Sequence, residues 1–218
     1  TSEPGSTYRY SNIASALAGY TLKAASGVPL DEYANTQIFS PLQMNNTSWR
    51  RSDLAEDNIA TPYIWDDESE ALLELPIYDL ATWPDGGLRS SANDLAKLLL
   101  AIMYQGEQPA SGNNQQAVQI LQEDSVITLL EPASDSGAGR GLDVGVFWMT
   151  TETQTGRELI GHAGSDPGAY SFMFFDPIAK VGVVMMGNGD DEITPRFDGE
   201  NGKLIENLLA AAEVLGDM

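Results

Sequence analysis

The sequence has no cysteine, a single histidine and only four lysines among its 218 residues. The absence of cysteine excludes disulfide bonds, zinc sites built on thiolates and a thiol nucleophile. No run is long and apolar enough to span a bilayer, and no basic segment followed by an apolar run indicates a signal peptide. Because the chain begins at Thr1 rather than at methionine, we expect processing or truncation.

Basic residues are scarce as a class: 11 Lys and Arg stand against 32 Asp and Glu, for a net charge of −21. Such a chain repels phosphate backbones and anionic headgroups, so we expect neither nucleic acid nor membrane among its partners. A salt-adapted source and an ordinary bias toward solubility both explain this acidity. The hydrophobic content of 42% is ample for a packed core.

Apolar residues at helical spacing predict several helices. The first covers about residues 11–26, with apolar positions at Ile13, Leu17, Tyr20 and Ala24. A short helix over about 31–39 follows, and another is predicted over about 116–130. Ser91 and Asp94 resemble a capping box, which predicts a helix from there to about Tyr104.

Residues 50–85 combine many carboxylates with scattered aromatic residues and prolines, which predicts a long irregular surface connection of the kind that often lines a site.

Strand-like runs gather in the last third of the chain. Four of them are rich in β-branched and aromatic residues, at 144–151, 157–162, 169–176 and 181–186. A terminal helix over 204–215 is able to cover one sheet face. The pattern predicts an α/β fold of the α+β type, an antiparallel sheet meander flanked by helices. Helices dominate about 1–135, and the strands and terminal helix occupy about 140–218.

The only histidine, His162, lies among the most strand-like runs, and we interpret it as the last residue of its strand. Gly164 and Gly168 flank the next three residues and would let the backbone approach a ligand closely. This segment is a candidate site wall. By itself, however, a lone strand histidine fits a satisfied structural residue better than a catalyst.

A second candidate stands at the start of the first helix. A turn there can hold the side chains of Tyr10 and Asn12 on one side of the backbone while Ser11 or Asn12 caps the helix. A phenol acts as a base only where a cation lowers its pKa from about 10. Taken alone, Tyr10 fits a half-buried aromatic residue better than a base.

Four blocks together resemble the serine β-lactamase and penicillin-binding-protein-like hydrolases, most closely the class C-type group that includes esterases, D-aminopeptidases and DD-peptidases. In order they are YSN at 10–12, PDGGLRSSANDLAKLLLAI at 84–102, GLDVGVFW at 141–148 and GHAGSDPGAYSFMFFDPIAKVGVVMMGN at 161–188. The resemblance spans almost the whole chain. It implies an incomplete β-lactamase/transpeptidase-like fold, no cofactor, no metal, and a periplasmic or secreted location.

The resemblance also implies roles for particular residues. The family's Tyr-x-Asn element supplies a base or proton relay, here Tyr10, and a contact to a substrate amide, here Asn12. Its Lys/His-x-Gly element matches the triplet from His162 to Gly164, and the residue after it, Ser165, would give a backbone N–H to an oxyanion hole. The implied catalytic residues are Tyr10, His162 and Ser165, and the implied substrate-binding residues are Asn12 and Gly164.

The family's Ser-x-x-Lys nucleophile motif has no counterpart in this chain. Three residues before Lys23, Lys97, Lys180 and Lys203 stand Tyr20, Asp94, Pro177 and Glu200. We therefore expect residues 1–218 to be the C-terminal portion of a β-lactamase-related serine hydrolase domain. Proteolysis, deliberate truncation and a split protein all explain the missing part.

Three functions follow as hypotheses. The first is part of a serine hydrolase acting on an ester, an amide or a β-lactam, inactive alone and completed by its missing N-terminal segment. The alternative is a catalytically inactive relative that binds peptidoglycan-like or peptide ligands in the same groove. The third is calcium binding, although the spacing of its acidic loop fails the EF-hand pattern and fits a solvated turn better. That loop contains Asp190, Asp191, Glu192, Asp198 and Glu200.

A further expectation concerns assembly. Without the N-terminal strands, a sheet edge or face carrying Val144, Val146 and Phe147 would lack its cover, which predicts self-association.

Overall fold

The structure is a computed structural model that describes residues 3, 9–110, 116–132, 143–189 and 199–216. Its centre is a five-stranded antiparallel sheet in the order β5-β6-β7-β8-β9. The strands are β5 (Asp143–Val144), β6 (Met149–Glu152), β7 (Glu158–Asp166), β8 (Ala169–Asp176) and β9 (Val181–Gly187). The predicted meander and the α+β class are confirmed.

One predicted strand, over 144–151, is two strands joined by a tight turn. The Gly145 N–H donates to the Trp148 carbonyl at 2.8 Å, and Phe147 has a φ of 65°. The chain therefore reverses between β5 and β6, and the sheet has five strands rather than four.

The interpretation of His162 as a strand end is wrong. β7 continues to Asp166, and the two residues Pro167 and Gly168 then turn the chain into β8. Gly168 has a φ of 70°, and a Cβ there would lie 2.7 Å from the Cβ of Pro62, so the turn requires glycine. The candidate residues His162, Gly164 and Ser165 thus lie within one strand.

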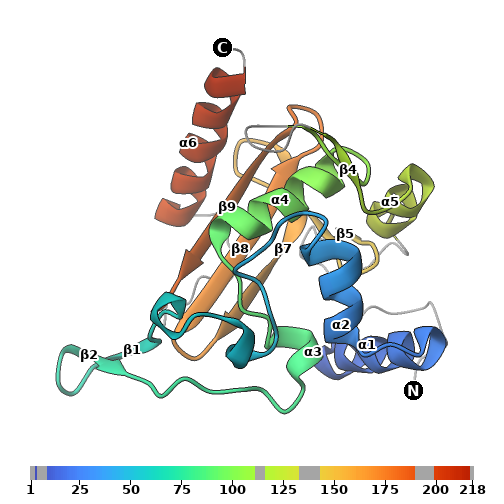
Figure 1. Cartoon of the computed structure of the whole chain (residues 1–218). Coiled ribbons are helices and arrows are strands. Elements are labelled where there is room, and N and C mark those ends of the chain that lie inside the picture. The colour runs from blue at the N-terminus through green and yellow to red at the C-terminus, as the bar shows by residue number, and fades with distance from the viewer. Residues whose placement is uncertain (1–2, 4–8, 111–115, 133–142, 190–198, 217–218) are drawn as a thin grey trace.

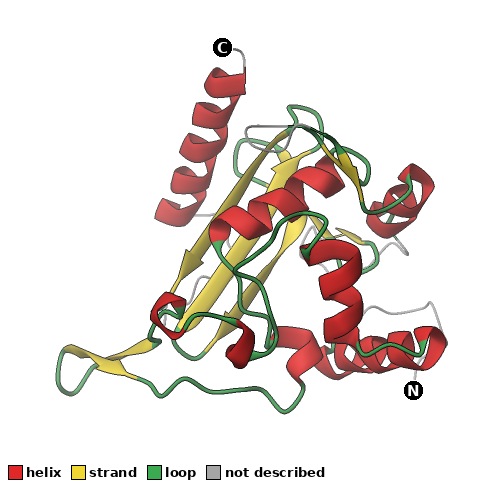
Figure 2. Cartoon of the chain, in the orientation of Figure 1, coloured by secondary structure: helices red, strands yellow, loops and turns green. Residues whose placement is uncertain are grey.

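Helices cover both faces of the sheet (Figures 1 and 2). One face packs against α6 (Gly199–Gly216), which confirms the predicted terminal helix. The buried residues of this layer are Leu159, Phe172, Phe174, Val183, Ile205 and Leu209. The other face packs against α4 (Ala92–Met103), where Phe175 of the sheet meets Leu99 and Ile102 of the helix.

The remaining helices are α1 (Asn12–Ser26), α2 (Leu30–Ala34) with a π-helical turn (Asn35–Phe39), α3 (Trp83–Gly86) and α5 (Glu123–Leu130). The helices predicted over 11–26, 31–39 and 91–104 are confirmed. Ser11 caps α1 by accepting from the Ala14 N–H at 3.2 Å, and Ser91 caps α4 by accepting from the Asp94 N–H at 3.2 Å.

The Asp94 carboxylate joins α4 to the loop before it. It is buried and accepts from the Asn46 N–H at 2.7 Å, from the Thr47 hydroxyl at 3.1 Å and from Lys97 at 2.8 Å. These partners, rather than the Ser91 N–H of a capping box, explain why an acidic residue stands at this position.

The helix predicted over 116–130 is wrong in its first half. β4 (Val118–Gln119) pairs antiparallel with β3 (Glu107–Gln108), and α5 begins only at Glu123. β3 and β4 have only two residues each, so the local pattern did not reveal this pairing.

The connection over 50–85 is mostly irregular, as predicted, with 3-10 turns at Arg51–Asp53 and Glu56–Asn58. It also contains an unpredicted hairpin of β1 (Tyr63–Asp66) and β2 (Ala71–Glu74), which projects from the body in Figure 1. The Asn188 carbonyl accepts from the Tyr63 N–H at 2.9 Å, so the base of the hairpin is held against the end of β9.

Candidate active site

The start of α1 lies against the middle of β7, and this contact brings together two residues that are far apart in sequence. Tyr10 immediately precedes the N-cap residue Ser11, and His162 lies within β7. Their ring centroids are 6.2 Å apart, and the ring planes are inclined by 32°. The phenol and the imidazole can therefore meet one small ligand.

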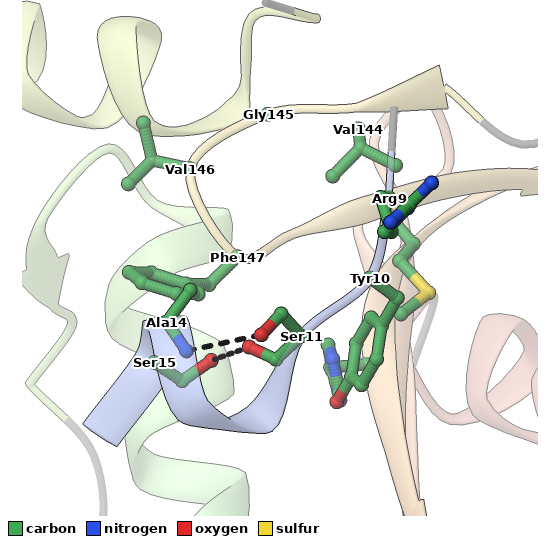
Figure 3. Close-up of a pocket in the computed structure, with 11 residues that line it drawn as sticks. Arg9, Tyr10, Ser11, Ala14, Ser15, Val144, Gly145, Val146 and Phe147 are labelled. Carbon is green, nitrogen blue, oxygen red and sulfur yellow. Dashed lines mark hydrogen bonds between the residues drawn. The ribbon is translucent and has the colours of Figure 1, made fainter. Parts of the chain in front are cut away.

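Two adjoining cavities open beside these rings. The first, of about 290 Å³, lies between the start of α1 and the β5–β6 turn (Figure 3). The second, of about 410 Å³, extends along α1 toward α3. Residues lining both are Tyr10, Ser15, Phe147 and His162. Most other wall residues are apolar, which favours a ligand with a substantial apolar part.

His162 is held in its neutral form. Burial lowers the pKa of its imidazole, and a backbone hydrogen bond with Ala163 opposes this shift without cancelling it. Desolvation disfavours the charged form of histidine. At neutral pH the ring therefore offers one hydrogen-bond donor and one acceptor instead of a positive charge.

Among the described residues, no strand pairs with the last part of β7 on the side of the cavities. Its pairing with β6 ends at Gly161, whereas its pairing with β8 continues to Asp166. The Thr153 N–H donates to the Arg157 carbonyl, so backbone groups of alternate residues from Arg157 onward point toward β6. By this alternation Ala163 and Ser165 direct their N–H and C=O groups to the side where β6 has ended.

The other predicted site residues lie outside the two cavities. Among the described residues, neither cavity is lined by Asn12, Gly164 or Ser165. Asn12 is the exposed first residue of α1, and Gly164 and Ser165 are exposed on β7. The structure thus brings Tyr10 and His162 together, whereas Asn12, Gly164 and Ser165 do not line either cavity.

Sequence reasoning missed Trp49 and Asp85, which line the second cavity. The buried Nε1 of Trp49 and the buried Oδ2 of Asp85 have no hydrogen-bond partner within the described part of the chain. An unsatisfied buried polar group costs about 1–3 kcal/mol. The only sequence signal was the position of Asp85 in the PDGG segment that contributed to the family resemblance.

Asp166 adds a second carboxylate near Asp85. Its Oδ2 lies 3.2 Å from the point that a Cβ on Gly86 would occupy. Burial raises the pKa of Asp166, and the charge of Asp85 raises it further. None of the ion pairs between described residues involves either carboxylate. This wall of the site is therefore electronegative.

No group of three or more His, Asp or Glu side chains in the described ranges is placed to hold a metal ion. The acidic loop considered for calcium, from Asp190 to Glu200, lies outside the residues whose side chains are described. None of the described helices is both long enough and apolar enough to cross a membrane.

The fold and the paired Tyr10 and His162 agree with the family comparison. A family model described as Beta-lactamase matches residues 1–205. The chain belongs to the β-lactamase family. Protein flp of Staphylococcus aureus (strain NCTC 8325 / PS 47) is 23% identical over 206 residues, which cover 94% of this chain and 37% of flp.

Two solved structures share the fold. The octameric penicillin-binding protein homologue from Pyrococcus abyssi superposes with a TM-score of 0.73 at 26% identity, over 86% of this chain and 40% of that one. D-amino acid amidase from Ochrobactrum anthropi SV3, complexed with L-phenylalanine amide, gives 0.73 at 19% identity, over 100% of this chain and 60% of the amidase. The chain thus spans less than two thirds of each relative, and its fold is incomplete beside theirs.

Proposed function

We propose that these 218 residues are the C-terminal part of a serine hydrolase that cleaves an ester, an amide or a β-lactam through an acyl-enzyme. A segment outside the chain supplies the nucleophile. The observation that carries the proposal is the proximity of Tyr10 and His162 beside the part of β7 that no described strand pairs with on that side, in a chain of the β-lactamase family.

In the proposed reaction, the serine oxygen of the missing segment bonds to the substrate carbonyl carbon while its proton leaves through Tyr10. The carbonyl electrons move onto oxygen, where the backbone N–H of Ser165 stabilises the oxyanion. When the intermediate collapses, the leaving group departs with the relayed proton. Water then attacks the acyl-enzyme by the reverse relay and releases the acid.

The remaining residues bind and orient the substrate. Neutral His162 acts as a hydrogen-bonding group, in agreement with the lowering of its pKa by burial. Asn12 contacts a substrate amide, and Gly164 leaves room for the substrate backbone along β7. An amide substrate is favoured by similarity to D-amino acid amidase and to a D-stereospecific amidohydrolase from Streptomyces sp..

Activity requires the missing segment in this proposal. No Ser-x-x-Lys motif exists in the 218 residues, so no hydroxyl stands beside a cationic relay. We expect the isolated chain to hydrolyse substrates at a rate near background and to bind them weakly.

Tyr10 and Tyr20 provide a matched test, because they are 54% and 55% exposed and only Tyr10 lines the cavities. In the longer gene product, Tyr10→Phe should lower hydrolysis of a p-nitrophenyl ester, a D-amino acid p-nitroanilide or a chromogenic β-lactam by about 10²–10⁴-fold. Tyr20→Phe should leave the rate unchanged. Turnover by the isolated 218 residues, abolished by His162→Ala, would show that the nucleophile lies within this chain.

The absence of the nucleophile motif also favours a second candidate, a catalytically inactive relative that binds peptidoglycan-like or peptide ligands in the same cavities. The two candidates differ in covalent chemistry. A fluorophosphonate or β-lactam adduct on the longer protein, seen by mass spectrometry, supports the hydrolase. Reversible binding without any adduct supports the binding module.

Self-association is a separate proposal. Val146 and Phe147 are 45% and 52% exposed at the rim of the first cavity, and a relative from Pyrococcus abyssi is octameric. Sedimentation of the 218-residue chain at rising concentration tests it, and a constant monomer mass would contradict it.

A further inference from the structure

The two cavities that meet at Tyr10 and His162 carry opposite charges. Arg9 lines the first cavity beside Tyr10 and Val144 (Figure 3). Because His162 is neutral, Arg9 is the sole charged residue among the described ones that line this cavity. Asp85 is likewise the sole charged residue among the described ones that line the second cavity. The site is therefore positive at one end and negative at the other.

Arg9 is an uncompensated cation in a chain that has few basic residues. Acidic residues outnumber basic ones by 32 to 11. Five basic residues form ion pairs with carboxylates: Arg50, Arg51, Arg89, Lys97 and Arg157. Arg9 forms none with a described carboxylate. A guanidinium binds a carboxylate through two parallel hydrogen bonds, so this end of the site suits a ligand carboxylate.

The negative end contains an unsatisfied oxygen. The Thr82 hydroxyl donates to Oδ1 of Asp85 at 3.1 Å, whereas the buried Oδ2 has no hydrogen-bond partner among the described residues. Asp166 lies close by, and the charge of Asp85 raises its pKa. A bound ammonium would offset the repulsion between the two carboxylates and would donate to the unsatisfied oxygen. This end of the site suits a ligand ammonium.

The wall shared by the two cavities connects these ends. It includes Tyr10 and His162, so a ligand that reaches both Arg9 and Asp85 passes the candidate catalytic groups. A single amino acid carries both of its charges close to one carbon atom, whereas two residues extend by about 7 Å. Cavities of about 290 and 410 Å³ suit a ligand of this size.

We propose that the site selects a short dipolar peptide, whose carboxylate binds Arg9 and whose free ammonium binds Asp85, with the scissile amide between them. The cleavage step rests on the proposed function: water supplies the hydroxyl of the new acid and the proton of the new amine. The dipolar requirement narrows the substrate class. A neutral ester lacks both charges, and an N-acylated β-lactam lacks the ammonium.

The experiment measures binding of phenylalanyl-glycine, in both configurations of phenylalanine, to the longer gene product. Four forms are compared: both ends free, N-acetylated, C-amidated, and both ends blocked. Ketomethylene analogues, in which CH₂ replaces the amide N–H, cannot be cleaved, and calorimetry gives their Kd. Acetylation should weaken binding about 10–100-fold, because Asp85 is partly buried. Amidation should weaken it about 2–5-fold, because Arg9 is exposed.

Two substitutions assign each preference to its residue. In Arg9→Gln, amidation of the ligand should no longer weaken binding, whereas acetylation still should. Asp85→Asn should give the opposite pattern. Lys23→Gln and Asp57→Asn remove the same charges at exposed positions that line neither cavity, and both variants should keep both preferences.

Equal affinity for the four forms overturns the dipolar site, as does failure of every form to bind. An equal change for all four forms in Arg9→Gln or Asp85→Asn also overturns it, because the residue would then act through the fold instead of through the ligand charge. The readout does not require turnover. Charge-dependent binding without hydrolysis keeps the dipolar site and defeats the proposed hydrolase. Hydrolysis that does not discriminate among the four cleavable forms does the reverse.

Discussion

α1 and α6 begin from similar sequence patterns and end in different environments. Both carry apolar residues at helical spacing. In α6, Ile205 and Leu209 are 2% and 0% exposed against the sheet, whereas Ile13 and Leu17 of α1 are 74% and 63% exposed. The comparison teaches that periodicity identifies the apolar face of a helix, and that only a partner element makes this face part of a core. In this chain the sheet covers the face of α6 that carries Ile205 and Leu209.

The largest expected effect comes from one substitution made in both helices. Leu209→Ala should lower the free energy of unfolding by about 2–5 kcal/mol, since it opens a cavity in the sheet layer. Leu17→Ala should change it by less than about 0.5 kcal/mol in the 218-residue chain, because its side chain is already in water. Urea denaturation measures both. A large loss for Leu17→Ala would mean that α1 is covered within this chain, and the comparison would fail.

The N-caps of α1 and α4 allow a second comparison between an exposed helix and a helix packed on the sheet. Ser11 and Ser91 accept equivalent hydrogen bonds, each at 3.2 Å, in α1 and α4. Ser91→Ala should lower global stability by about 1 kcal/mol, because α4 packs on the sheet. Ser11→Ala should instead speed amide hydrogen exchange within α1 and leave the urea midpoint nearly unchanged. Equal shifts of the two midpoints would show that α1 unfolds together with the sheet.

His162 makes the folding stability of the chain depend on pH. Burial lowers the pKa of its imidazole in the folded chain, so the unfolded chain binds the proton more readily and stability falls as pH drops. The contribution is complete above about pH 6.5, the ordinary value, and is lost as pH falls through the folded pKa. Because the chain has one histidine, the imidazole NMR titration belongs to this residue alone.

On acidification the wild type should therefore lose unfolding free energy relative to His162→Gln, by at most about 1.4 kcal/mol per pH unit. A folded-state pKa at or above the ordinary value would contradict the burial of the His162 ring beside Tyr10.

The smallest expected effect concerns Asp166. Burial and Asp85 raise the pKa of its carboxyl, so ionisation opposes folding: the chain is relatively stable below the ordinary value of about 4 and loses this stability as pH rises through the folded pKa. Asp166→Asn should stabilise the chain at neutral pH and have no such effect in acid. The gain should shrink in an Asp85→Asn background. Asp57→Asn, at an exposed position, is the control. An equal gain in stability in this variant would mean that the gain comes only from the reduced net charge.

Much of the fold was predictable because its patterns are local. The helical spacing of α1 and the Ser91 cap of α4 lie within a few residues of one another, and the runs of β8 and β9 carry strand composition around a turn signal. The β1–β2 hairpin was missed because its strands have only four residues each and include acidic positions. β4 was missed because it and its partner β3 have only two residues each, too few to show an alternating pattern.

The candidate site was predictable only in part. Tyr10 and His162 were recognised from family motifs, and the structure adds their separation of 6.2 Å. Their catalytic roles, and those of Asn12, Gly164 and Ser165, stay predictions. Trp49 and Asp85 carried no motif of their own, since an unsatisfied buried atom is a property of its surroundings.

By itself the sequence determined the family, the antiparallel meander, the starts of α1 and α4 and the absence of a Ser-x-x-Lys motif, because each depends on residue identity and on spacing along the chain. Only the tertiary structure decided that β7 runs on past His162, that within the described residues β6 pairs with β7 only as far as Gly161, and that α1 keeps its apolar face exposed. Burial, pKa and strand pairing depend on which distant segments share the same space, and no local pattern specifies those neighbours.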